Sequence, residues 1–364
     1  MLSVTVRLKK IVITLISVLA FLAVFIFSNQ IRQGILKGLT LCFQSVIPSL
    51  FLFTALSLFI AYSGVAKALG RLISPVTRLL LGLEGSTATT FLLSAVSGYP
   101  VGAKLVNDLY VRGEISHEKA LKMLTFCVNA GPSFIILAVG KATLNSVSDG
   151  QRLLLAHITA TLVLAASIRF LPDRFFLKSH QKEKNTVQES KLSLTVSDAF
   201  VMSVSEAGKT IINICTFVVF FSAIEGLVLS FGSEIMNEVS RLLEVTVGVQ
   251  SLSRKSLSKV SFLLGFGGIS VIFQVMAAAN KIKPDFKLIL VSRVAHGLLS
   301  AGIIAVLEKL FSRTIETVQL GRPIQSNAFG TTPVATISLM LLLVVLLGFI
   351  KSKAAQTRGK SKQK

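Results

Sequence analysis

The sequence has little charge, few cysteines and no motif of a catalytic site. Only 15% of its 364 residues are charged, whereas a soluble domain carries about 25%. Cys42, Cys127 and Cys215 have neither a CxxC spacing nor a paired loop context, which argues against a disulfide framework or a zinc site. It also contains no P-loop, nucleophile elbow or metal-binding His/Glu spacing. We therefore expect no enzyme, no cofactor or metal, and no transport driven by its own nucleotide hydrolysis.

Long apolar runs are what the sequence has in abundance, since 52% of its residues are hydrophobic. A membrane-spanning helix needs roughly 17–25 mostly apolar residues. Windows of about this length are 11–27, 39–61, 123–139, 153–170, 211–231, 288–307 and 334–350. The sequence therefore predicts an all-α, polytopic membrane protein of about seven or eight spans.

Acidic residues are scarce, with 17 Asp and Glu against 38 Lys and Arg. The basic residues lie between the apolar spans and at the two ends of the chain, where the positive-inside rule places them. No nucleic-acid recognition motif accompanies this charge. Membrane lipids with anionic headgroups are thus the expected partner, and nucleic acid is not.

The amino end resembles a signal peptide, because Arg7, Lys9 and Lys10 precede the apolar run from Ile11 to Phe27. The residues that follow lack a small-x-small cleavage pattern. We interpret this segment as an uncleaved first span whose amino terminus is cytoplasmic.

A polar, basic stretch from 169 to 191 divides the chain and indicates a cytoplasmic linker. The segments on its two sides follow a similar order of apolar span, amphipathic stretch, broken arms and span. We expect an N-terminal transmembrane anchor, a first repeat, the basic linker, a second repeat, and a C-terminal transmembrane helix with a basic tail. Their predicted bounds are 1–30, 31–171, 172–198, 199–330 and 331–364.

One ungapped offset of 167 residues (296 minus 129) aligns several features of the two halves. Gly98 then corresponds to Gly265, and Asn129 corresponds to His296. Such similarity predicts an internal repeat. An odd number of crossings in the first half would make the two copies inverted, an architecture common in transporters, and we predict inverted repeats with broken or re-entrant helical hairpins.

Two glycine- and proline-containing breaks interrupt apolar sequence in the first half, at 98–102 and at 129–133. Irregular backbone at bilayer depth survives only where protein or water satisfies it. The breaks are either an unwound substrate site or tightly packed hairpin tips, and Asn129 and His296 either bind solute or join helices. The residues that we predict to form a binding site are Gly98, Tyr99, Pro100, Gly102, Asn107, Asn129, Gly131, Pro132, Ser133, Gly265, Gly267, Gly268, Ser270, Gln274 and His296.

Glu225 is the acidic residue that we single out within a predicted span, 211–231. It is either a proton or cation site, or a residue that lies near the end of the span.

Three segments carry a family resemblance: Ser97–Lys104, Gly113–Ser116 and Phe126–Pro132. With them the chain resembles the YlbJ family of sporulation integral membrane proteins, within the wider nucleoside-recognition or Gate group. The resemblance covers roughly 34–310. It implies a role in forming the spore cortex at a mother-cell or forespore membrane, with an unidentified solute.

Two functions follow from these observations. One is a permease for a small polar solute, and the other is a non-transporting scaffold that docks partners during spore-envelope assembly. The linker is too short for a large soluble domain, which favours transport. The expected partners are membrane lipids, a small-molecule solute, and a second copy of the chain or other sporulation membrane proteins.

Overall fold

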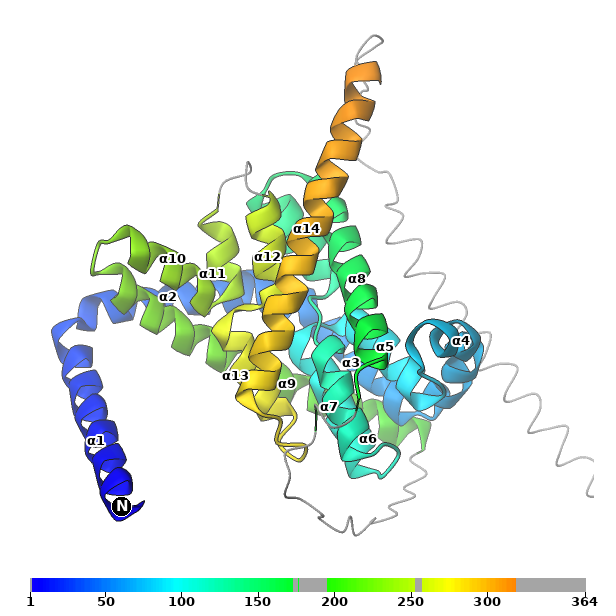
Figure 1. Ribbon diagram of the computed structural model, residues 1–364, viewed down its shortest axis with the longest axis horizontal. Helices are drawn as coiled ribbons and strands as arrows, with labels where there is room; N and C mark the ends of the chain where they lie inside the picture. The colour runs from blue at the N-terminus through cyan, green and yellow to red at the C-terminus, as the bar shows by residue number, and fades with distance from the viewer. Residues whose placement is uncertain (1, 173–175, 177–194, 253–256, 319–364) are drawn as a thin grey trace, which may run out of the picture.

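A computed structural model describes residues 2–172, 176, 195–252 and 257–318. In this part of the chain the structure consists of helices, and no strand occurs (Figure 1). The all-α prediction is confirmed. The helices are α1 (Leu2–Ile26), α2 (Ser28–Leu41), π-helical η1 (Cys42–Val46), α3 (Ile47–Tyr62), α4 (Val65–Leu81), α5 (Ser86–Ser97), α6 (Tyr99–Val111), α7 (His117–Phe126), π-helical η2 (Phe134–Thr143), α8 (Val147–Arg169), α9 (Val196–Leu229), α10 (Glu234–Leu243), α11 (Val245–Gln250), α12 (Leu257–Phe266), α13 (Gly268–Ala278) and α14 (Phe286–Val318).

Within the described residues, five helical segments are long and apolar enough to cross a membrane. A sixth is possible if α4 and α5, which meet at an angle of 86°, form one broken span. The polytopic prediction is confirmed, while the predicted last span, 334–350, lies outside the described residues. The five segments are Ser28–Tyr62, Val147–Arg169, Val196–Leu229, Leu257–Ala278 and Phe286–Leu310.

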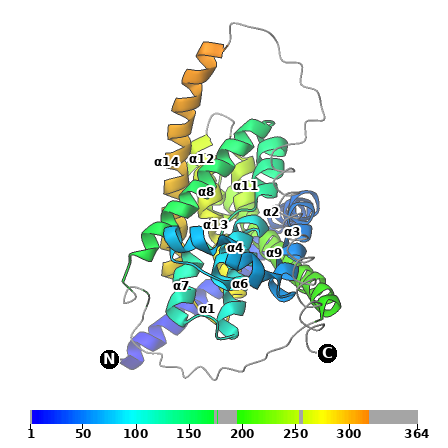
Figure 2. The same cartoon turned by 90° about the vertical axis from the view of Figure 1, so that its right-hand side faces the viewer.

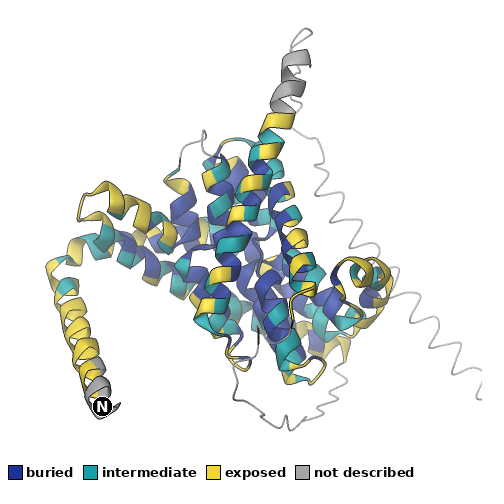
Figure 3. Ribbon diagram, viewed as in Figure 1, coloured by how far each residue is buried: buried dark blue, intermediate teal, exposed yellow. Residues whose placement is uncertain are grey.

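Buried residues gather where α6, α7, α8, α12, α13 and α14 meet, and α8, α12 and α14 lie side by side (Figure 2, Figure 3). The helix α1 projects from this body, and most of its apolar side chains from Leu8 to Ile26 are exposed. Its apolar part, Lys10–Ile26, coincides with the predicted first span. In a membrane protein such side chains face lipid or another protein.

The helix formed by α2, η1 and α3 packs against α9 over most of its length. Near one end the rings of Phe27 and Phe231 lie 5.6 Å apart, and near the other those of Phe59 and Phe200 lie 6.1 Å apart. The residue number rises along one helix as it falls along the other, so the two helices are antiparallel. Each is the first long helix of its predicted repeat.

Small residues allow this close approach. A Cβ atom at Gly34 would lie 2.2 Å from the carbonyl oxygen of Ser222, and one at Gly226 would lie 2.4 Å from that of Gln30. The two backbones therefore touch, as small-residue interfaces between membrane helices do.

Glu225 lies near the end of α9, and its carboxylate is 3.2 Å from the Nζ atom of Lys37 on α2. The carboxylate is almost fully buried, while the lysine is partly exposed. This geometry supports a structural ion pair between the two antiparallel helices.

The helix ends agree with the predicted offset. Adding 167 to Tyr62 and Val111, the last residues of α3 and α6, gives 229 and 278, the last residues of α9 and α13. The two halves are thus consistent with an internal repeat. The inversion of the repeats stays a prediction.

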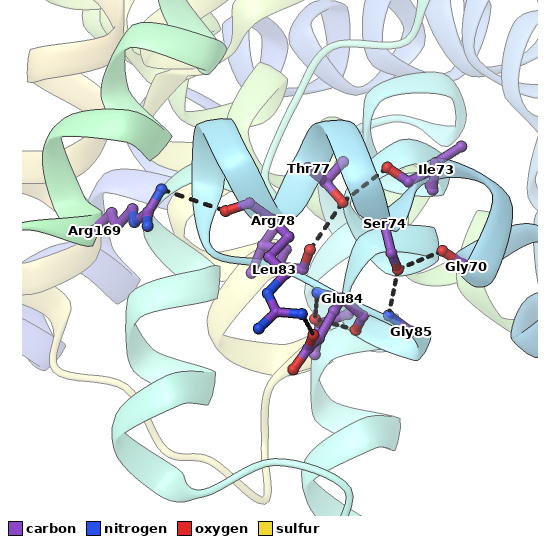
Figure 4. A network of polar contacts seen from close by, with 10 residues as sticks. Gly70, Ile73, Ser74, Thr77, Arg78, Leu83, Glu84, Gly85 and Arg169 are labelled. Atoms are coloured by element: carbon purple, nitrogen blue, oxygen red, sulfur yellow. Dashed lines mark hydrogen bonds and ion pairs between the residues drawn. The ribbon is translucent and has the colours of Figure 1, made fainter.

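Polar contacts fix the turn from α4 into α5 (Figure 4). The Thr77 hydroxyl donates to the Leu83 carbonyl at 2.8 Å, and the backbone N–H of Gly85 donates to Ser74 Oγ at 2.8 Å. Arg169, at the end of α8, donates to the Leu79 carbonyl at 2.6 Å. Because α4 is held at both its turn and its last carbonyls, the direction in which α5 enters the protein is set.

α6 folds back along α5. A Cβ atom at Gly102 would lie 2.7 Å from the Cβ atom of Ser94, whereas eight residues of straight helix span about 12 Å. The helices α5 and α6 therefore form a hairpin with Gly98 at its tip. A hairpin tip is one of the two alternatives that we predicted for this break.

We predict that Gly34→Ala lowers the free energy of unfolding by about 1–3 kcal/mol, because the added methyl group overlaps the backbone of α9. Thermal unfolding in detergent measures this. Gly208→Ala on α9 is the control, since a Cβ atom there meets no atom within 4 Å. A melting temperature of Gly34→Ala equal to that of the control would contradict the close packing.

Candidate functional site

Four helix breaks lie in the interior. They are Gly98 between α5 and α6, residues 127–131 between α7 and the helix that leads into η2, Glu244 between α10 and α11, and Gly267 between α12 and α13. Gly98 has a φ of 99° and Gly267 a φ of 82°, values that L side chains rarely adopt. The sequence predicted the breaks at Gly98, around 129–133 and around Gly267. It did not predict the one at Glu244.

The breaks converge in pairs. A Cβ atom at Gly131 would lie 3.0 Å from the Val96 carbonyl oxygen, just before the Gly98 break. A Cβ atom at Gly268 would lie 3.1 Å from the backbone nitrogen of Val245. Two breaks of the first half thus touch each other, and so do two of the second half.

A cavity of about 30 Å³ lies among these breaks. This volume holds only a few water molecules, so a larger solute requires the lining to move apart. The predicted site residues in the lining are Gly98, Tyr99, Pro100, Gly131 and Gln274. The cavity is also lined by Val46, Leu50, Phe134, Ile214, Val218, Glu244, Val245, Thr246 and Val271.

Glu244 is the acidic side chain of this lining, and it is 1% exposed. It caps α11: its Oε2 accepts a hydrogen bond from the backbone N–H of Val247 at 2.9 Å, and Thr246 Oγ1 lies 3.2 Å from Oε1. No cationic nitrogen of the described residues lies within 4 Å of this carboxylate. Glu244 lies outside the five candidate spans, and burial raises the pKa of its carboxyl group.

Sequence reasoning missed Glu244. The available signal was a single acidic residue between apolar neighbours on both sides, at 242–243 and 245–249. Because 232–250 was not among the predicted spans, that signal gave no reason to expect a buried carboxylate.

Asn129 and His296, which the offset predicts to be counterparts, meet in one buried hydrogen-bond network. Thr161 on α8 lies between them: its hydroxyl donates to Asn129 Oδ1 at 2.7 Å and is 3.2 Å from His296 Nε2. The Asn129 amide also donates to the Phe126 carbonyl at 2.9 Å. These bonds join α8, α14 and the break after α7, which supports the interhelical role of the two alternatives.

Arg293 on α14 is fully buried in the same network. Its guanidinium donates to the carbonyl oxygens of Thr125 (2.6 Å) and Val128 at the broken end of α7. His157 Nε2 on α8 accepts the backbone N–H of Ala130 at 3.1 Å. The backbone groups that the break frees are therefore bonded to side chains of two other helices, as buried polar groups require.

The remaining predicted residues serve packing and chain geometry. Asn107 Oδ1 accepts the backbone N–H of Lys281, and Ser270 Oγ accepts from the Gln274 amide, both at 3.0 Å. Residues that pack closely against backbone or shape a break are Gly102, Pro132, Ser133, Gly265, Gly267 and Gly268.

Comparison with known proteins gives two matches. Residues 43–147 match the family model Gate, described as nucleoside recognition. The chain is also 25% identical over 316 residues to the "Sporulation integral membrane protein YlbJ" of Bacillus subtilis (strain 168), covering 75% of this chain and 76% of that protein. The predicted resemblance to the YlbJ family is confirmed. No solved structure matches the chain.

The Gate segment lies inside the predicted first repeat. It begins at Phe43 within η1, contains the α5–α6 hairpin and the break after α7, and ends at Val147, the first residue of α8. The chain is thus an integral membrane protein similar to a sporulation protein, with a Gate segment that contributes two of the three breaks that line the cavity.

We predict that Arg293→Met destabilises the protein, since two buried carbonyl oxygens lose their donors at about 1–3 kcal/mol each. The free energy of unfolding in detergent is the measurement. The control is Arg112→Met, which breaks a partly exposed pair with Glu114 and removes less than about 1 kcal/mol. Equal stability of the two variants would contradict the role of Arg293.

Proposed function

We propose that this protein is a sporulation-related transporter of the cell membrane, which passes a small polar solute through the cavity between its two halves. The observation that carries this proposal is the meeting of three helix breaks, at Gly98, Gly131 and Glu244, in the lining of one cavity. Broken helices in membrane proteins are tolerated where they line a cavity or are buried in protein. Their free carbonyl groups and helix ends are suited to contact a solute.

The α5–α6 hairpin is the element that we expect to move. Its tip, Gly98 to Pro100, lines the cavity, and a Cβ atom at Gly98 would lie 3.2 Å from the Leu50 side chain. In this proposal the tip moves about Gly98, whose φ is 99°, while the hydrogen-bonded turn at 82–85 stays in place. The solute itself is unidentified, and nucleosides are one class to test because of the name of the Gate model.

The similarity to YlbJ supports the biological setting. In this proposal the transporter works in a mother-cell or forespore membrane and supports formation of the spore cortex. Its amino end and the basic linker face the cytoplasm. The amphipathic helix α4, with basic Lys67 and Arg71 and exposed Leu72 and Leu79, lies against anionic lipids on that side.

The second candidate function is a scaffold for other sporulation membrane proteins or a second copy of the chain. The observation that favours it is α1, whose apolar side chains, such as Phe21 at 64% and Ile26 at 72%, are exposed and leave a face for another protein. Among the helices that the structure describes, α1 makes its main contact with α2.

We predict that the purified protein in liposomes takes up at least one member of a panel of nucleosides, amino acids and monovalent and divalent ions. Gly98→Ala and Asn129→Leu are expected to abolish this uptake, because they deform the cavity and the network beside it. Radiotracer uptake measures the effect. Gly64→Ala is a matched control, since Gly64 also has a positive φ of 77° but meets no atom within 4 Å of an added Cβ.

Spore heat resistance provides the second readout, in a strain whose chromosomal copy is replaced by each variant. We expect cortex-defective spores from Gly98→Ala and normal spores from Gly64→Ala. Normal spores from both Gly98→Ala and Asn129→Leu, together with no uptake of any solute, would exclude transport and leave the scaffold function.

A further inference from the structure

We propose that Glu244 is the protonation site of the cavity: it holds a proton while the cavity is closed and releases it when the cavity opens to water. This inference rests on the proposed transport function, because the proton is exchanged when the proposed transport cavity opens and closes. It names the residue that makes this movement depend on pH.

The first argument is the burial of an unpaired carboxyl group. Glu244 is 1% exposed, and no cationic nitrogen of the described residues lies within ion-pair distance of it. An ionised carboxylate without a partner in such a place costs several kcal/mol, and a group in this position takes up a proton instead. By contrast, the buried carboxylate of Glu225 is 3.2 Å from Lys37.

The second argument is the set of groups that face Glu244 from the elements around it. Tyr99 on α6, Cys42 of η1 and Glu225 on α9 are within electrostatic reach, and α13 contributes the neutral Gln274. None of these four supplies a positive charge.

Arg293 is a buried cation that acts on the same Tyr99, with the opposite sign to Glu244. Its guanidinium is already bonded to the backbone after α7 and to His296. Arg293 therefore does not compensate the carboxylate, and protonation remains the way to remove the charge.

The third argument is that burial outweighs the hydrogen bonds of Glu244. The bonds from the Val247 N–H at 2.9 Å and from the Thr246 hydroxyl at 3.2 Å favour the carboxylate and lower its pKa, but burial has the larger effect and raises the pKa. After protonation, Oε2 can keep the bond from Val247 and Oε1 can donate its proton to the Thr246 hydroxyl, since a hydroxyl group both donates and accepts.

Opening the cavity reverses the balance. Water that enters solvates the carboxylate, and the acid gives its proton to that water, leaving a carboxylate and a hydronium ion. Closure of the cavity requires Glu244 to take up a proton again from the side to which it was open. Because the cavity is protonated whenever it is closed, one proton crosses in each direction over a full cycle, so no net proton moves and a lower pH favours the closed state.

Infrared spectroscopy of the purified full-length protein tests this directly, with pH and H/D exchange as the probes. We expect a C=O stretching band of a protonated carboxyl group at neutral pH in the wild type and its complete loss in Glu244→Gln. Glu238→Gln is the control and keeps the band, since Glu238 is exposed and paired with Arg241. Absence of the band from the wild type, or its persistence in Glu244→Gln, would overturn the assignment.

Glu244→Asp is a second variant that tests the assignment even if Glu244→Gln does not fold. It keeps a titratable group on a shorter side chain, so the band is expected to shift while the melting temperature stays close to that of the wild type. An unshifted band would show that another carboxyl group gives the signal, which also overturns the assignment.

The liposome assay then separates the two proposals. With the same pH inside and outside, we expect the rate of uptake of the panel solutes to change with pH in the wild type and to stay constant in Glu244→Gln. Uptake by the wild type that does not depend on pH overturns the role of Glu244 protonation but leaves transport standing. A Glu244 band without uptake of any solute overturns the transport function instead.

Discussion

The hydrogen bonds of Arg293 to the broken end of α7 are the constraint on which the interior depends. A break in a membrane helix frees carbonyl and N–H groups that hydrocarbon cannot satisfy. Arg293 takes two of those carbonyl groups, and His157 takes the N–H of Ala130. Because these partners lie on α14 and α8, the break can exist only where the three helices meet. Gly131, a few residues further on, is thereby placed against the tip of the α5–α6 hairpin.

Two parts of the structure differ in how they are held. The antiparallel pair of long helices, α2–α3 and α9, is joined by glycine contacts and by the Lys37–Glu225 ion pair. The lining of the cavity is held instead by turns and short helices that end at breaks. Both parts contain packed backbones, because a Cβ atom at Gly102 of the hairpin would overlap the carbonyl oxygen of Cys127.

Glu244 shows why the site was only partly predictable. Glycine and proline in apolar sequence mark breaks wherever they occur, so Gly98, Gly131 and Gly267 could be found without a structure. The role of a carboxylate depends on its surroundings. The surroundings of Glu244 come from α6, α9 and α13, which are separate segments of the chain. The same holds for Arg293, whose bonded carbonyl of Val128 is 165 residues away.

The sequence by itself determined that the protein is helical, membrane-embedded and interrupted at particular glycines, and it indicated the offset at which helix ends recur. These properties follow from local composition. Backbone N–H and C=O groups in hydrocarbon must bond to each other, which requires a helix, and glycine allows the backbone conformations that interrupt one. Only the tertiary structure decided which interrupted segments face each other. It separated Asn129 and His296, which join helices, from Gly98 and Gln274, which line the cavity, and it placed Glu244 beside that cavity with no cation of the described residues within ion-pair distance. Such outcomes depend on packing between distant helices, for which a single sequence carries no local signal.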